Sequence, residues 1–168
     1  ILAIVVGILY RVSVANEQKV LTTQFARALL NEDPAIKAKE LLALPKGKGE
    51  LGAQVACIAG QAALRAGEYD KAQEAFDRVK KDFADSSYVP EATEGLGAVL
   101  EAQQKYAEAL PIYKEVLEKW PTTFAGRRQP TNIGRLQEQL GNVKDAVAAY
   151  QQQTTIFPGS QLAQEAQG

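Results

Sequence analysis

The sequence predicts an all-α solenoid of antiparallel helix pairs, and two observations carry the prediction. Equivalent positions recur every 37 residues between Gly60 and Pro158, and each copy repeats one chemical order of small residue, second small residue and aromatic ring. A fixed period between about 20 and 50 residues is typical of solenoids, in which each unit buries its apolar face against the next. The recurring positions are Gly60, Gly97 and Gly134; Ala72, Ala109 and Ala146; Phe76, Tyr113 and Tyr150; and Phe83, Trp120 and Phe157.

The spacing within each unit has a physical explanation. Two antiparallel helices approach closely only where one of them presents Gly or Ala, and a neighbouring ring then fills the groove. Gly67, Lys105 and Asn142 fall at the turn between the helices, where Gly and Asn tolerate the left-handed conformation. Pro121 and Pro158 follow the second helices, and proline ends a helix because it lacks the N–H. Each unit is therefore predicted to be a helical hairpin.

The quoted residues resemble the tetratricopeptide (TPR) family. The family's places for small, small, large and helix-ending residues are filled by Gly60, Ala72, Phe76 and Ala84; by Gly97, Ala109, Tyr113 and Pro121; and by Gly134, Ala146, Tyr150 and Pro158. The resemblance implies a right-handed superhelix with three TPR-like repeats over residues 52–158. The usual unit has about 34 residues, and the three additional ones fall in a loop, where insertions cost little.

The longer unit is similar to the TPR proteins of the bacterial envelope, of the Tol-associated coordinator and barrel-assembly lipoprotein types. The overall layout also resembles the ancillary translocon subunit type.

Composition limits the classes of function. The chain has 168 residues, is 46% apolar and carries a net charge of -1, so a nucleic-acid partner is not expected. It has no histidine and one cysteine, which removes the commonest general base and any multi-cysteine zinc site. We therefore predict no catalytic residue, no metal and no cofactor, and a protein that is not an enzyme.

The first ten residues are apolar and carry no charge. A membrane span needs about 20 such residues, and the sequence begins inside the apolar run, so we expect residues 1–14 to be the C-terminal part of a transmembrane helix. The only early positive charges are Arg11 and Lys19, which favours a periplasmic or other extracytoplasmic location for the rest of the chain. The alternatives are a signal-peptide core and a buried first helix. The predicted anchor residues are Ile1, Leu2, Ile4, Val5, Val6, Ile8, Leu9 and Tyr10.

Residues 15–45 are expected to form a degenerate helix pair that caps the solenoid. Asp33 is a natural N-cap with Pro34 at the first helical position, while Thr23 and Lys39 stand where Gly and an aromatic are expected. An unrelated helical hairpin is the alternative, and it would cap the array equally well. The later helices are predicted at 52–66, 69–83, 87–103, 106–119, 127–140 and 143–156. Pro130 predicts that the 127–140 helix begins late or is kinked, and Ser160 predicts a short terminal helix in 159–168.

Function is expected from the surface rather than from the core. The resemblance implies that the first helices of successive units line a concave groove, and spacings of three, four and three keep each set on one helical face. The middle set is acidic and the third begins with arginine, which favours a bipolar groove for an extended or helical peptide. For any one of these charges the alternative is a solvated face with local pairs. The groove residues are Gln54, Cys57, Gln61 and Leu64; Glu91, Glu94, Ala98 and Glu101; and Arg128, Thr131, Arg135 and Glu138.

These observations predict a membrane-tethered protein–protein interaction module. We expect an accessory or scaffolding subunit of a larger envelope complex, such as a translocon, an assembly machine or a bioenergetic complex. The alternatives are a TPR protein that self-associates through the groove, and the regulatory domain of an enzyme complex. The family's carboxylate clamp is not supported, because its places are held by Cys57, Gln61, Gly95, Arg128 and Asn132.

Overall fold

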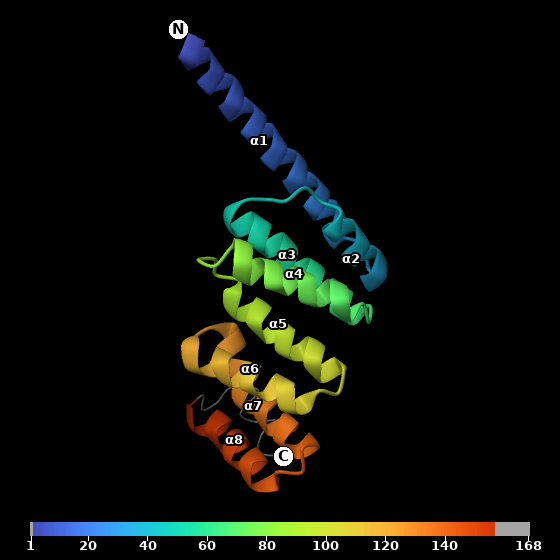
Figure 1. Ribbon diagram of the computed structural model, residues 1–168, viewed down its shortest axis with the longest axis vertical. Coiled ribbons are helices and arrows are strands. Elements are labelled where there is room, and N and C mark those ends of the chain that lie inside the picture. Colours follow the sequence, from blue (N-terminus) through green and yellow to red (C-terminus); the bar gives the residue numbers. More distant parts are fainter. Residues whose placement is uncertain (1, 157–168) are drawn as a thin grey trace.

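The structure is a computed structural model that describes residues 2–156, apart from the side chains of residues 2–4 and 8. These residues form eight α-helices and contain no strand, so the all-α prediction is confirmed (Figure 1). The predicted terminal helix at 159–168, with Ser160, lies outside the described residues, as do Phe157 and Pro158. The helices are α1 (Leu2–Leu29), α2 (Pro34–Leu42), α3 (Gly49–Arg65), α4 (Tyr69–Asp82), α5 (Val89–Ala102), α6 (Tyr106–Lys119), α7 (Phe124–Gln139) and α8 (Val143–Ile156).

The helices from α2 onward stack in chain order along the long axis of the molecule (Figure 1). Each helix packs against the next, and in addition α3 contacts α5 and α5 contacts α7. The helices α4, α6 and α8 make no comparable contacts with one another. Closer spacing on one side of a stack makes that side the inner one, so α3, α5 and α7 line the concave face.

The predicted packing of glycine against rings is confirmed in all three repeats. A Cβ atom added at Gly60 would lie 2.7 Å from Cε1 of Phe76, and one at Gly97 would lie 2.5 Å from Cε1 of Tyr113. At Gly134 the same atom would lie 2.5 Å from Cε1 of Tyr150. The absence of a side chain on the first helix of each pair therefore makes room for the ring on the second.

The turns between paired helices follow the same period. The backbone is left-handed at Gly67 (φ 74°), Gln104 (φ 61°) and Gly141 (φ 78°), which are successive 37-residue equivalents. Sequence reasoning placed the second and third turns one residue later, at Lys105 and Asn142. Gln104 has a Cβ and holds a conformation that favours glycine, which makes it the strained member of the set.

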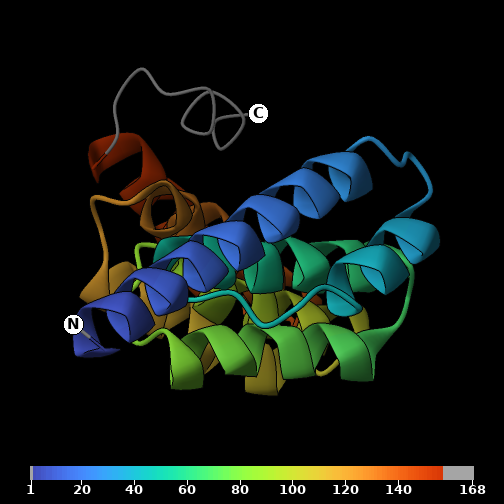
Figure 2. The same cartoon turned by 90° about the horizontal axis from the view of Figure 1, so that it is seen from above.

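The first helix pair departs most from the prediction. Helix α1 is long and continuous, and its N-terminal half extends beyond the helix stack (Figures 1 and 2). Of its described side chains only Leu21, Phe25 and Ala28 are buried. Thr23 and Lys39 replace the glycine and the ring, so α1 and α2 lack the fit that joins the later pairs.

The predicted membrane anchor is wrong. Within residues 2–156 no helix combines the length and the apolar character needed to cross a bilayer. The physical reason lies in the continuation of α1, where Arg11, Glu17 and Lys19 follow the apolar run within a few turns. The predicted extracytoplasmic location depended on that span, and it is wrong with it. The residues concerned are Ile1, Leu2, Ile4, Val5, Val6, Ile8, Leu9 and Tyr10, of which Ile1 lies outside the described residues.

Helix capping follows the sequence at one helix and differs from it at another. Asp33 accepts hydrogen bonds from the N–H groups of Ala35 (2.8 Å) and Ile36 (3.2 Å), as predicted for an N-cap. Helix α7 does not begin late: it starts at Phe124 and continues through Pro130. Thr123 caps it by accepting a hydrogen bond from Gly126 N–H at 3.0 Å. This cap fixes the helix start one turn and a half before the proline.

Candidate functional site

The residues predicted to line a groove all lie on the three inner helices. Gln54, Cys57, Gln61 and Leu64 lie on α3; Glu91, Glu94, Ala98 and Glu101 lie on α5; and Arg128, Thr131, Arg135 and Glu138 lie on α7. Their exposure is uneven, because Cys57 is buried whereas Gln61, Arg135 and Glu138 are exposed and the others are half-buried. The exposed members lie toward the C-terminal ends of α3 and α7.

At those C-terminal ends, four of the predicted residues surround a hollow of about 460 Å³. Leu64, Ala98, Glu101 and Arg135 come from three different helices, and each helix pair contributes one wall. Sequence reasoning missed three lining residues: Ala102, Tyr106 and Gln139. Tyr106 had a usable signal, because it is the 37-residue equivalent of Tyr69 and opens the helix that follows α5.

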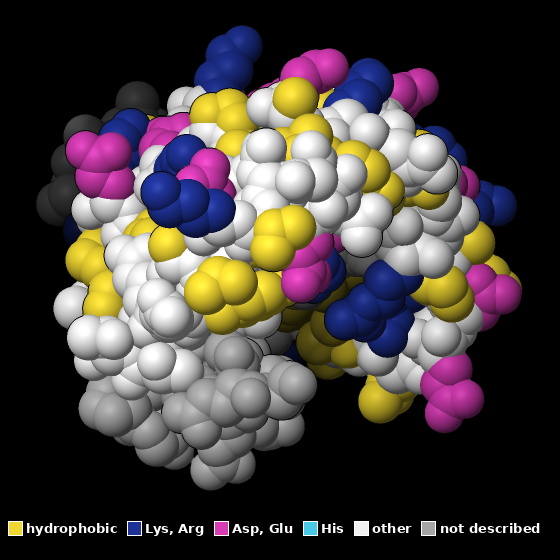
Figure 3. Space-filling view, turned by 90° about the horizontal axis from the view of Figure 1, so that it is seen from below, with side chains coloured by type: hydrophobic (Ala, Val, Ile, Leu, Met, Phe, Trp, Pro, Cys, Tyr) yellow, Lys and Arg dark blue, Asp and Glu magenta, His cyan; other side chains and the backbone are white. Residues whose placement is uncertain are grey.

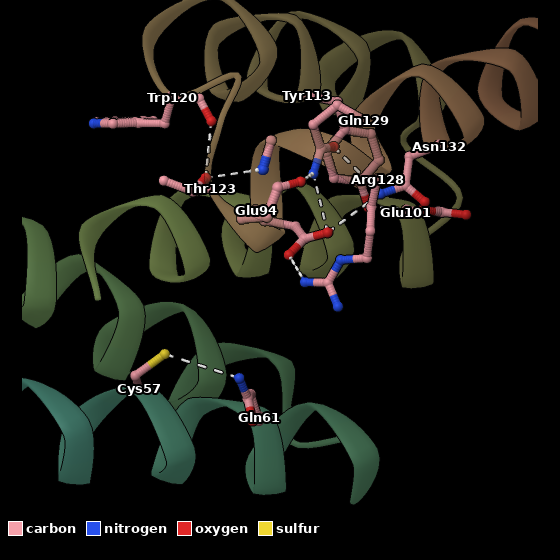
Figure 4. A network of polar contacts seen from close by, with 12 residues as sticks. Cys57, Gln61, Glu94, Glu101, Tyr113, Trp120, Thr123, Arg128, Gln129 and Asn132 are labelled. Carbon is pink, nitrogen blue, oxygen red and sulfur yellow. Dashed lines mark hydrogen bonds and ion pairs between the residues drawn. The ribbon is translucent and has the colours of Figure 1, made fainter. Parts of the chain in front are cut away.

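Glu94 is the centre of a polar network between α5 and α7 (Figure 4). Its carboxylate forms an ion pair with Arg128 and accepts hydrogen bonds from the side-chain amides of Gln129 (3.0 Å) and Asn132 (3.3 Å). Burial raises the pKa of Glu94 above its ordinary value, and these three donors only partly offset that effect. The network therefore stabilises a carboxylate that burial destabilises.

Glu101 repeats this arrangement two groove positions further along α5. Its oxygens accept two hydrogen bonds from Arg135, each 2.9 Å long, in a bidentate pair, and a third from the Tyr113 hydroxyl at 2.8 Å. Burial raises the pKa of Tyr113, and the neighbouring Glu101 raises it further. Tyr113, predicted only as a packing residue, thus both fills the space beside Gly97 and holds a groove carboxylate.

The bipolar character predicted for the groove is lost through this pairing. Glu94 and Glu101 of α5 pair with Arg128 and Arg135 of α7 rather than remaining available to a partner. Both ion pairs join residues 34 positions apart, Glu94 with Arg128 and Glu101 with Arg135, so they lie one helical turn out of register with the 37-residue repeat. That offset is the signal that would have found them.

Two groove carboxylates remain without a cation among the described residues. Glu138 is exposed and accepts a hydrogen bond from Tyr150 at 2.9 Å, but it has no ion pair. Glu91 is half-buried, and its Oε2 atom is shielded from water and accepts no hydrogen bond within residues 2–156. Two further shielded atoms of this face lack a partner in the same part of the chain, Arg128 Nε and Thr131 Oγ1.

Cys57 and Gln61 lie on α3, apart from the network of Glu94 (Figure 4). The Gln61 amide nitrogen lies 3.9 Å from the Cys57 sulfur. Burial raises the pKa of Cys57 to about 12, and the carboxylates of Glu91 and Glu94 contribute. Because the thiolate is the reactive form, this thiol is not poised for nucleophilic chemistry. In the described part of the chain there is also no group of three or more His, Cys, Asp or Glu residues suited to a metal ion.

Comparison with known proteins identifies the repeat. Models of the tetratricopeptide repeat match residues 59–122 and 131–159, and no curated protein matches the chain. Among solved structures, the MamA RS-1 ArsTM double mutant is similar at 22% identity and a TM-score of 0.66, over 86% of this chain and 77% of that one. MamA 41-end from Desulfovibrio magneticus RS-1 gives 20% identity, a TM-score of 0.65 and the same coverage.

A third solved structure, of PcrH in complex with the chaperone binding region of PopB, is similar at 22% identity and a TM-score of 0.60. It matches over 73% of this chain and 98% of that one. At these identities the likenesses establish the fold. The two segments matched by the repeat models together cover more than half of the chain. The chain therefore belongs to the tetratricopeptide-repeat family, whose members are protein-interaction modules rather than enzymes.

Proposed function

We propose that this chain binds a segment of another polypeptide along the concave face of α3, α5 and α7, and thereby serves as an accessory or scaffolding subunit of a larger protein complex. The observation that carries the proposal is the hollow of about 460 Å³ where Leu64, Ala98 and the Glu101–Arg135 pair meet. Pockets that hold a ligand side chain are concave and mostly apolar, with a few polar groups that fix orientation. In this hollow Leu64 and Ala98 supply apolar surface, and the Glu101–Arg135 pair supplies the polar groups.

The polar groups beside the hollow favour a polypeptide ligand. Arg135 uses Nε and Nη2 for Glu101, and within the described residues its Nη1 makes no hydrogen bond. A guanidinium held in place by a bidentate pair presents its remaining N–H groups in a fixed direction, which suits a backbone carbonyl. An extended segment can therefore place one side chain in the hollow and bond to Arg135 through its main chain.

A selection experiment tests this proposal. Random peptides displayed on phage are selected against the folded chain, and the recovered peptides are measured against two variants by fluorescence anisotropy. Ala98→Trp fills the hollow without changing charge, and Ala107→Trp places the same ring on the exposed side of α6 as a control. We expect the first variant to weaken binding by at least about tenfold and the second to leave it unchanged. Recovered peptides that bind Ala98→Trp normally would show that this face is not the site.

One observation favours self-association as a second function. The first half of α1 exposes large apolar side chains, with Val6 58%, Leu9 64% and Tyr10 64% accessible. Contiguous apolar surface on a protein is a frequent sign of an interaction site. Analytical ultracentrifugation of the chain and of Leu9→Glu tests this function. A concentration-dependent dimer that the substitution dissociates supports it, and a monomer at every concentration rejects it.

A further inference from the structure

We infer that the segment bound by this groove is basic, with one Lys or Arg residue on each side of an apolar side chain. This inference rests on the proposed function and names the chemistry of the partner. The inference follows from which charges on the concave face are paired with each other. The residue types alone indicate a bipolar groove, whereas the charges that remain unpaired are of one sign. The predicted groove positions of α5 and α7 hold four carboxylates and two arginines, and both of these arginines are already bound.

The unpaired charges on this face are therefore both negative. Arg128 neutralises Glu94 and Arg135 neutralises Glu101, which leaves Glu91 and Glu138 without a cation in residues 2–156. The predicted groove positions of α3 add no charge, because they are held by Gln54, Cys57, Gln61 and Leu64. Figure 3 shows acidic and basic side chains beside a hollow at the α8 end of the molecule. A bound segment thus meets a face whose uncompensated charge is acidic.

Glu91 supplies an independent reason for a cationic ligand. Its Oε2 atom is shielded from water yet accepts no hydrogen bond among the described residues. A shielded carboxylate oxygen without a donor is unfavourable, because it has lost its hydrogen bonds to water and no protein donor replaces them. An ammonium or guanidinium group in the groove beside Glu91 supplies the missing countercharge and donates to the other carboxylate oxygen, Oε1, which is not shielded in this way.

Glu138 marks the other end of the site. It stands on α7 at the position that Glu101 holds on α5, and each accepts a hydrogen bond from the tyrosine twelve residues later. Glu101 obtains its arginine from the next inner helix, α7, whereas Glu138 is exposed and makes no ion pair with any residue that the structure describes. Glu138 is therefore available to a residue of the ligand.

The hollow between these two ends sets the spacing in the ligand. Glu101 follows Glu91 by ten residues, about 15 Å along the axis of α5. Glu138 holds the equivalent position on the neighbouring helix α7, about 8 to 10 Å to the side, so Glu91 and Glu138 are about 17 to 18 Å apart. An extended peptide covers that distance in about five residues. The matching segment therefore has basic residues about five positions apart, with an apolar side chain between them that enters the hollow of Leu64 and Ala98.

A larger hollow elsewhere on the described part of the chain offers no comparable specificity for charge. It has a volume of about 980 Å³ and lies between α2 and α4, with Val55, Ala56 and Ala59 of α3 among its lining residues. Its charged residues are divided equally between acidic and basic types, so charge selects no partner there. The concave face is where charge and an apolar hollow together specify a ligand.

The test compares two synthetic peptides on the full chain. One has a central Leu flanked by Lys residues five positions apart, and the other has Glu in place of both Lys. We expect the Lys peptide to bind about tenfold more tightly, since each exposed ion pair contributes about threefold. Glu91→Gln and Glu138→Gln should each reduce the preference about threefold, whereas Glu74→Gln, an exposed carboxylate on α4, should not change it.

The outcomes separate this inference from the proposed function. If the preference for Lys survives the double substitution of Glu91 and Glu138, or if the Glu peptide binds as well, the inference is overturned. Ala98→Trp then tests the proposed function by itself. If that variant loses binding, the peptide still binds in the groove, and only the inference about its charge fails. If random selection yields groove-dependent peptides but neither synthetic peptide binds, the inference alone fails. If selection yields no groove-dependent peptide, the proposed function fails as well.

Discussion

At the scale of single residues, the contact between glycine and ring determines how closely each helix pair packs. Gly97 shows this most directly, since an added Cβ would lie 2.5 Å from Cε1 and 2.8 Å from Cδ1 of the buried Tyr113. Tyr113 cannot move away easily, because its hydroxyl is bound to Glu101. The fit is therefore constrained from both ends of the ring.

Gly97→Leu should destabilise the fold by about 1 to 3 kcal/mol through overpacking. The measurement is urea unfolding followed by circular dichroism. Gly7 provides the control, because an added Cβ there meets nothing within 4 Å. Gly7→Ala should be neutral or slightly stabilising, as expected for an exposed helical position. Equal stabilities of the native chain and Gly97→Leu would mean that the ring does not occupy this space.

The tyrosines beside the groove predict a loss of stability at alkaline pH. Burial, followed by the hydrogen bond to Glu138, raises the pKa of Tyr150 to about 12, and burial followed by Glu101 raises that of Tyr113. The unfolded-state pKa of tyrosine is about 10. Because the folded-state values of these two tyrosines are higher, their contribution to the free energy of unfolding is fully present below about pH 10. That stability is lost as the pH rises towards about 12.

Tyr113→Phe tests this pH dependence. Removing the hydroxyl deletes one donor to Glu101 and should cost about 1 kcal/mol at neutral pH. It should also flatten the decline in stability between about pH 9 and 12, as measured by urea unfolding at several pH values. Tyr10→Phe is the matched control, because Tyr10 is exposed on α1. A decline of unchanged steepness in Tyr113→Phe would assign it to other groups.

At the scale of helices, the ion pairs join α5 to α7 across the concave face. Arg128→Ala should leave Glu94 largely buried without its cation, with a cost of about 2 kcal/mol at neutral pH. Arg135→Ala should cost less, because Arg135 is more exposed and Glu101 keeps Tyr113 as a donor. Urea unfolding of the two variants beside the native chain measures the difference.

The pH dependence of Arg128→Ala distinguishes loss of the pair from loss of packing. Burial already raises the folded-state pKa of Glu94, and removal of Arg128 should raise it further. A raised pKa means that the contribution of Glu94 is fully present below its unfolded value and is lost as the pH rises through its folded value. The variant should therefore lose more stability than the native chain as the pH rises above the ordinary pKa of a glutamate, about 4.3. Parallel profiles would attribute the cost to lost packing around the Arg128 stem.

Contacts between helices of one repeat can be predicted from the sequence more readily than contacts between different repeats. Gly60 and Phe76 belong to one repeat, so their contact is copied at every period and stands out when the copies are aligned. The pair of Glu94 and Arg128 joins different repeats at an offset of 34 residues, and such an alignment does not display it. The apolar start of α1 has no copy at all, so nothing in the pattern indicated its surroundings, and the membrane prediction failed there.

At the scale of the whole molecule, the buried apolar side chains form two clusters. The larger extends from Leu21 on α1 to Val99 on α5, and the smaller comprises Ala109, Tyr113, Ile133, Leu136 and Ala149 on α6 to α8. In a solenoid each unit contacts only its neighbours, so stability is nearly a sum of local terms. A molecule with an uneven core of this kind is expected to open first at its weaker end.

Gly134→Leu should separate the two ends of the array. The new side chain would meet Tyr150 at 2.5 Å from its Cβ and disrupt α7 and α8. Hydrogen exchange followed by mass spectrometry should then show amides of α7 and α8 exchanging at least about tenfold faster. Those of α3 and α4, two elements away, should keep their native protection, because only the intervening α5 and α6 link them to the damaged end. Gly97→Leu is the comparison, since its lesion lies in the middle of the array and should speed exchange on both sides. Uniform acceleration across all helices in Gly134→Leu would mean that the eight helices open as one cooperative unit despite their two clusters.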